Sequence, residues 1–123
     1  MHPSTEFLRA LFELALPELE AEARTGRFNL RVHHLGDPEG GDYSFDVRLI
    51  LPGREGQLRP EGFPVTPETM LLGLRKAFRK NSPVPPRDLR LLERACRQGA
   101  THMLTDAHGS VLVQLAIFGE IVF

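Results

Sequence analysis

The chain of 123 residues has a single cysteine, Cys96, and no tryptophan. One cysteine excludes a disulfide within the chain, and it also excludes a zinc site built from several cysteines. No apolar run approaches the roughly 18 residues of a membrane-spanning helix, so we expect no membrane span. Met1-His2-Pro3 leads directly into a helical pattern. We therefore expect no signal peptide and a cytoplasmic location.

Amide side chains and lysine are also scarce. Asn and Gln together number five, and the basic residues comprise 13 Arg but only two Lys. A low content of heat-labile side chains is compatible with a thermophilic source, although a GC-rich genome also explains the arginine excess. Hydrophobic residues make up 41% of the chain and charged residues 25%. These values are ordinary for a globular protein, so we expect one domain over residues 1–123.

The net charge of −1 conceals an uneven distribution along the chain. Residues 1–68 carry seven basic and twelve acidic side chains, whereas residues 69–98 carry eight basic and only two acidic ones. Residues 99–123 contain two acids and no Lys or Arg. The positive charge is thus concentrated in one segment, which makes that segment the first candidate for binding an acidic partner.

Helical spacing of apolar residues predicts a first helix over 4–16, with Ser4 as its N-cap. Pro17 is expected to kink this helix or to restart it, because proline cannot donate an interior hydrogen bond. The segment 18–24 has high helix propensity, and Gly26 is a natural C-terminal cap.

Two further helices are predicted later in the chain. Thr66-Pro67-Glu68 combines a capping hydroxyl, a proline at the first helical position and an acid in the first turn. The helix that starts there has one apolar face between 70 and 78, and the proline-rich segment 81–86 ends it. A helix over 86–98 follows, with Gly99 as its C-terminal cap.

Four strands are predicted from period-two alternation and from turn residues. Residues 28–35 and 43–51 alternate apolar and polar side chains on either side of a glycine-rich loop. Residues 101–105 and 111–118 are expected to form a second hairpin around a turn at 106–110. The intervening segment 52–67 contains four prolines and is expected to be irregular.

The predicted order is therefore α-β-β-α-α-β-β. We expect an α+β fold in which two hairpins form an antiparallel sheet and the helices pack on one face of it. One face of the first hairpin is polar. A ligand site is one interpretation of it, and a face that is solvated or covered by a partner is the more common one. The residues of this polar face are Asn29, Arg31, His33, Ser44, Asp46 and Arg48.

The basic segment 70–98 carries the clearest candidate site. Within the helix over 86–98, arginines recur at i, i+3, i+7 and i+10, which places them within an arc of about 80° opposite the apolar side. Arginine forks suit phosphate oxygens, so a nucleic-acid surface or another anionic partner is one interpretation. A solvated face, or one neutralised by the acidic first helix, is the alternative. The candidate residues are Arg75, Lys76, Arg79, Lys80, Arg87, Arg90, Arg94 and Arg97.

The segment 111–118 is apolar on both faces of the predicted strand, which is typical of a central strand or an interface strand. Together with the apolar chain end at 121–123, it predicts a homodimer surface. The interface residues expected from this pattern are Val111, Val113, Leu115, Ile117 and Phe123.

Catalytic and metal-binding patterns are weak. Asp106, His108 and Ser110 lie in one predicted turn, and His102 is nearby, but neighbours in a tight turn do not form a converging triad. We assign no catalytic residue, no metal and no cofactor, and expect Cys96 to be a small buried side chain. The sequence thus favours a non-enzymatic cytoplasmic protein that acts by association, as a homodimer or with another protein. The alternative is a nucleic-acid-binding or regulatory module.

Overall fold

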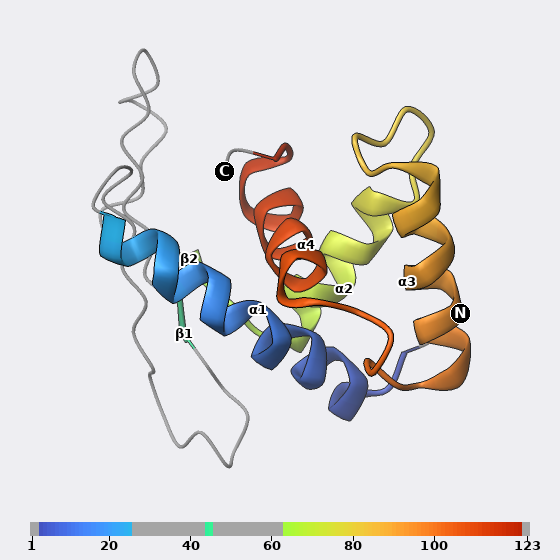
Figure 1. The fold of residues 1–123 in the computed structure, drawn as a ribbon, viewed down its shortest axis with the longest axis horizontal. Helices are drawn as coiled ribbons and strands as arrows, with labels where there is room; N and C mark the ends of the chain where they lie inside the picture. The colour runs from blue at the N-terminus through green and yellow to red at the C-terminus, as the bar shows by residue number, and fades with distance from the viewer. Residues whose placement is uncertain (1–2, 26–43, 46–62, 122–123) are drawn as a thin grey trace.

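The computed structural model describes residues 3–25, 44–45 and 63–121, and Figure 1 shows their arrangement. Helices α1, α2 and α4 pack against one another, and α3 lies at one edge beside α2 (Figure 1). None of the described helices combines the length and the apolarity that a membrane crossing demands. The helices are α1 (Thr5–Thr25), α2 (Pro67–Ala77), α3 (Pro86–Gln98) and α4 (Asp106–Phe118).

Helix α1 starts at the predicted cap and joins the two predicted helical segments, 4–16 and 18–24, into one helix. The Ser4 hydroxyl oxygen accepts a hydrogen bond from the Phe7 backbone N–H at 3.1 Å. Of the two outcomes predicted at Pro17, a kink or a restart, the restart is wrong, because α1 continues through Pro17 to Thr25 as one helix. Proline has no N–H, so the carbonyl oxygen of Glu13, four residues earlier, has no helical hydrogen-bond donor. Pro17 and Glu13 are both exposed, so water can donate to that carbonyl oxygen.

Helices α2 and α3 begin where their N-terminal signals predict, and α3 ends at Gly99 as predicted, whereas α2 ends at Ala77, before the proline-rich segment 81–86. At the start of α2, the hydroxyls of Thr66 and Thr69 each accept from the other residue's backbone N–H, at 3.4 and 3.0 Å. Helix α3 begins at Pro86 and is followed by Gly99, which has a φ of 64° in the left-handed region. These boundaries confirm the local signals, because capping depends only on residues within one turn.

Helix α4 is the most deeply buried element. Buried residues occur all around it, from Gly109 to Ala116, because α1 and α2 both pack on it. Gly109 is where α1 comes closest: a Cβ at this position would lie 2.8 Å from the Leu11 carbonyl oxygen. Glycine here allows the two helix backbones to approach more closely than any larger side chain permits.

The predicted second hairpin is wrong. Residues 106–118 are helix α4, and 101–105 form the connection that precedes it. The segment 106–110, predicted as a hairpin turn, is the first helical turn. An apolar run without polar alternation is typical of a buried strand and equally of a helix that is covered on every side. Packing between α1 and α2 selects the helix.

The α+β fold class is wrong as well. The described residues form a helical assembly in which the only strands are β1 (Ser44–Phe45) and β2 (Phe63–Pro64). These two pair antiparallel, with Phe45 opposite Phe63. The predicted strand 28–35 lies outside the described residues, as does most of 43–51. Two residues in each strand do not make the sheet of two hairpins that the alternation predicted.

Candidate functional site

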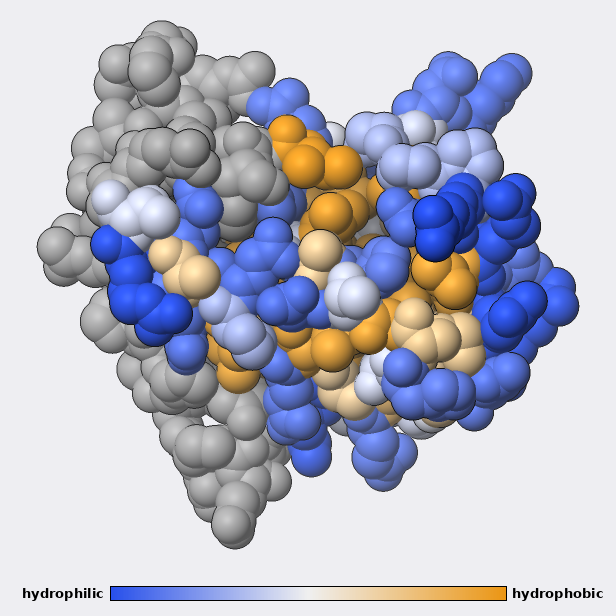
Figure 2. Space-filling view, in the orientation of Figure 1, coloured by the Kyte–Doolittle hydropathy of each residue, from blue (hydrophilic) through white to orange (hydrophobic). Residues whose placement is uncertain are grey.

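Helix α3 presents its arginines to solvent. Its inner face contributes Leu92 and Ala95, which are 1% and 0% exposed, to the core. The edge of the molecule formed by α3 is strongly hydrophilic in the space-filling view (Figure 2). The arginines that the structure leaves exposed on this helix are Arg87, Arg90, Arg94 and Arg97. They define what we call the α3 arginine face.

Both acidic residues of α3 already have partners. Glu93 forms an exposed ion pair with Arg97, one turn away on the same helix. Asp88 Oδ1 lies 3.0 Å from His108 Nε2, so this carboxylate is directed at α4. Among the described residues no carboxylate forms an ion pair with Arg87, Arg90 or Arg94. The acidic helix α1 makes its main contacts with α2 and α4. The positive charge of the α3 arginine face is therefore not neutralised by the acids of α1.

The basic residues of α2 do not form one continuous face. Arg75 is exposed, whereas Lys76 is partly buried and its Nζ donates to the Ala116 carbonyl oxygen at 3.4 Å. Lys76 thus binds the C-terminal end of α4, where unpaired carbonyls carry partial negative charge. Arg79 and Lys80 follow in the turn after α2 and are exposed.

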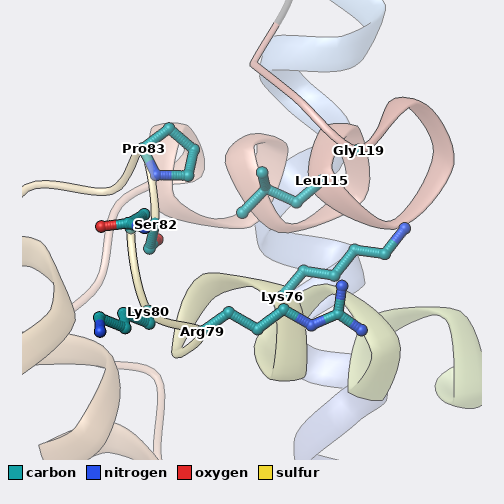
Figure 3. A pocket seen from close by; sticks show the side chains of 8 residues that line it. Lys76, Arg79, Lys80, Ser82, Pro83, Leu115 and Gly119 are labelled. Atoms are coloured by element: carbon teal, nitrogen blue, oxygen red, sulfur yellow. The ribbon is translucent and has the colours of Figure 1, made fainter.

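A hollow of about 250 Å³ lies between this turn and the end of α4 (Figure 3). In the close-up, the side chains of Lys76 and Arg79 extend in the same direction, and Lys80 extends the opposite way. The residues lining this hollow, which we call the turn pocket, are Lys76, Arg79, Lys80, Asn81, Ser82, Pro83, Leu115 and Gly119.

The predicted dimer residues are divided between core and surface. Val113 and Leu115 are each 1% exposed and belong to the core of the single chain. Val111 and Ile117 are partly exposed, and Phe123 lies outside the described residues. Because α4 is a helix, residues two positions apart no longer share a face, so the predicted strip of alternating residues does not exist.

The turn residues Asp106, His108 and Ser110 do not converge on one point. The Asp106 carboxylate accepts from the neighbouring Ala107 N–H at 3.0 Å and is exposed. The imidazole of His108 is bound to Asp88, while the hydroxyl of Ser110 is fully buried and accepts from Gln114 Nε2 at 3.0 Å. These contacts stabilise the helix and leave no nucleophile facing a base.

The environment of two ionisable groups shifts their pKa. Partial burial, then the charges of Asp106 and Glu22, raise the pKa of the Glu18 carboxyl. Burial, with a contribution from Glu93, raises the pKa of the Cys96 thiol. A raised thiol pKa disfavours the thiolate, so Cys96 is a poor nucleophile. The side chain was expected to be buried, and the structure leaves it partly exposed.

Within the described ranges, no three His, Cys, Asp or Glu side chains are grouped as a metal site would require. Of the predicted polar sheet face, only the backbone of Ser44 is described, and it pairs with Pro64. The other five residues of that face, Asn29, Arg31, His33, Asp46 and Arg48, lie outside the described residues.

The link between His108 and helix α3 was missed by the sequence analysis. The Thr105 backbone N–H donates to His108 Nδ1 at 2.9 Å, which closes the first turn of α4. The spacing Thr105-x-x-His108 matches that of a capping box, in which Glu or Gln is the usual third residue. This spacing was the local signal that a helix begins at Asp106.

Comparison of the chain with known protein families, with curated proteins and with solved structures finds no match. Function is therefore inferred from the side chains of this chain and their arrangement.

Proposed function

We propose that this protein binds nucleic acid, or a similar polyanion, through the α3 arginine face. The observation that carries the proposal is the solvent exposure of Arg87, Arg90 and Arg94 along one side of a helix, with no ion-pair partner among the described residues. Guanidinium groups bind phosphate oxygens with two parallel hydrogen bonds, and they bind them better than lysine does.

The dimensions of the face support this proposal. The last arginine lies ten positions after the first, so the face is about 15 Å long at 1.5 Å per residue. Phosphates of one DNA strand follow one another every 3.4 Å or so along the helix axis. The face therefore spans about four phosphates of a single strand. Arg97 forms an ion pair with Glu93, but an exposed ion pair of this kind is weak enough for a phosphate to replace Glu93.

The expected binding mode is backbone contact without base recognition. No aromatic side chain occurs in α3, so stacking on unpaired bases does not contribute. Binding that rests on a few phosphate contacts is sensitive to salt and tolerant of sequence. We propose a cytoplasmic location for this activity.

The test is fluorescence anisotropy with a labelled duplex at several salt concentrations. For three free arginines we expect a slope of log K against log salt of about −3. The double variant Arg90→Gln/Arg94→Gln should reduce the magnitude of the slope by about 2. Arg24→Gln is the matched control, because Arg24 is exposed at the end of α1 on the opposite side of the molecule (Figure 1). Binding that is independent of salt, or unchanged in the double variant, would refute the proposal.

Self-association is the second candidate. Ile121 is 39% exposed just beyond α4, and Val111 and Ile117 are partly exposed on it. Apolar surface gathers over the C-terminal half of α4 in Figure 2. Ile117→Asp should convert a dimer into a monomer in light scattering, and an unchanged mass would exclude this surface. Val113 is unsuitable for this test, since a charge in the core unfolds the chain itself.

A further inference from the structure

We propose that the turn pocket binds a single phosphate group, of the dianionic kind found in inorganic phosphate and phosphate monoesters. This inference does not rest on the proposed function, because the turn pocket and the α3 arginine face are built from different residues. It rests on the composition of the pocket, on its size and on how the turn holds its side chains.

The lining of the turn pocket is basic and rich in hydrogen-bond donors. Lys76, Arg79 and Lys80 are basic, and no Asp or Glu is among the lining residues. The side chains of Lys76 and Arg79 extend together, whereas that of Lys80 extends the opposite way and adds its charge only from a greater distance (Figure 3). The Asn81 amide and the Ser82 hydroxyl add neutral donors. Phosphate oxygens accept hydrogen bonds from this set of donors, whereas a cation or an apolar ligand would be repelled or left without partners.

The partial negative charge at the end of α4 is already balanced. One N–H of Lys76 Nζ is directed at the Ala116 carbonyl oxygen, 3.4 Å away, and the ammonium has two more donors to offer. The charges of Arg79 and Lys80 remain. Among the described residues no carboxylate pairs with either of them. An anion in the pocket would pair with the Arg79 guanidinium, which extends in the same direction as Lys76 (Figure 3).

The size of the pocket limits what it can hold. At about 250 Å³ it is smaller than the roughly 300–1,000 Å³ of pockets that enclose drug-sized ligands. A phosphate group fits this space, and the rest of a phosphate monoester would extend into solvent through the open side. The expected ligand is therefore bound by its phosphate alone.

The turn that carries these residues is fixed by its own hydrogen bonds. The Ser82 N–H donates to the Arg79 carbonyl oxygen at 3.2 Å, and the Val84 N–H donates to the Ser82 hydroxyl oxygen at the same distance. Asn81 has a φ of 65°, a left-handed conformation that asparagine tolerates and that reverses the chain. Val84 is buried at 5% exposure and attaches the turn to the core.

The first experiment is isothermal titration with inorganic phosphate at constant ionic strength, with chloride as the replaced anion. We expect saturable binding by the unmodified protein. In Arg79→Gln/Lys80→Gln the Kd should rise about tenfold or more. Lys76 is left unchanged in this variant because it stabilises the end of α4. The proposal would be overturned if titration with phosphate released the same heat as titration with chloride, or if the Kd for phosphate were unchanged in the double variant.

Two controls separate this site from the α3 arginine face. Arg24→Gln and Arg90→Gln/Arg94→Gln should each keep the phosphate Kd within about twofold of the unmodified protein, since distant sites act independently. If the α3 variant loses duplex binding and keeps phosphate binding, both proposals stand. If it loses phosphate binding as well, while Arg79→Gln/Lys80→Gln does not, the assignment to the turn pocket is wrong.

A pair of oligonucleotides identifies the source of the phosphate. A strand with a 5′-phosphate that binds more tightly than its 5′-hydroxyl twin, with the difference lost in Arg79→Gln/Lys80→Gln, assigns the pocket to nucleic-acid ends. Equal binding of the two strands, with phosphate titration still saturable, assigns it to free phosphate or small phosphorylated compounds. Both outcomes support a phosphate site.

Discussion

Gly73 of α2 lies directly against the backbone of Leu112 in α4. A Cβ built on Gly73 would stand 2.3 Å from the Leu112 carbonyl oxygen and 3.3 Å from its Cα. Real Cβ atoms do not approach a backbone oxygen so closely, and a backbone cannot yield as the end of a flexible side chain does. The absence of a side chain at Gly73 therefore sets the distance between α2 and α4.

Gly73→Ala should destabilise the protein. Alanine favours a helix over glycine by about 0.5–1 kcal/mol, but separating α2 from α4 should cost about 1–3 kcal/mol or more. Urea unfolding should therefore show a lower free energy of unfolding. Arg75→Ala, an exposed position on the same helix, is the control and should change stability by less than about 0.5 kcal/mol. A stabilised Gly73→Ala protein would contradict the close approach of the two helices.

His108 should carry its proton on Nε2. Its Nδ1 accepts from the Thr105 N–H, which leaves Nε2 to donate to Asp88 at 3.0 Å. His108→Ala removes the cap and the link to α3, so we expect a loss of about 1–2 kcal/mol. His108→Gln keeps a residue that can cap and should lose less. Imidazole nitrogen shifts in NMR report the tautomer directly, and a proton on Nδ1 would contradict this arrangement.

Glu18 should make the folded state less stable as the pH rises. Burial and the charge of Asp106 raise its pKa above the ordinary value of 4.5, so near that pH the folded state binds more protons than the unfolded state. The free energy of unfolding then decreases with rising pH, from about 4.5 up through the folded pKa, and the loss persists at neutral pH.

Glu18→Gln removes this titration. The variant should gain stability relative to the unmodified protein between pH 4 and pH 7, as measured by urea unfolding at each pH. Glu13→Gln is the control, because Glu13 is an exposed carboxylate of the same helix. Parallel pH profiles for the Glu18 variant and the unmodified protein would show that its carboxyl is not destabilised by folding.

The buried pair Ser110 and Gln114 should be coupled in stability. Both are at most 1% exposed, and the Gln114 amide donates to the Ser110 hydroxyl oxygen. Ser110→Ala removes this acceptor from a buried amide, so we expect a cost of about 1–3 kcal/mol. With Gln114→Leu in addition, part of the loss should be recovered. A double-mutant cycle measures the coupling, and strictly additive effects would contradict it.

The starts of α2 and α3 and the end of α3 were predictable from the sequence because their signals are local. Thr66 caps α2 with a hydroxyl one turn away, and Gly99 ends α3 because it adopts the left-handed conformation at little cost. The exposure of the α3 arginines follows from the same local pattern, since a helix that buries Leu92 and Ala95 turns the opposite side outward.

The roles of Lys76 and His108 were not predictable in this way. By sequence Lys76 is one of several basic residues in its segment, but its Nζ donates to the Ala116 carbonyl oxygen, 40 positions along the chain. His108 binds Asp88, 20 positions away. Contacts of this length depend on where α4 lies relative to α2 and α3, and spacing along the chain carries no information about that.

The amino-acid sequence by itself determined the caps, the two basic helices and the uneven charge of this protein. Only the tertiary structure decided the conformation of residues 106–118. Their apolar side chains are equally compatible with a buried strand and with a helix that is covered on every side. Gly73 and Gly109 let α2 and α1 approach α4 from two sides, and this packing buries Val113 and Leu115 within one chain. A helix that satisfies its own backbone hydrogen bonds fits that enclosed position, whereas a strand would need a neighbouring strand to do so.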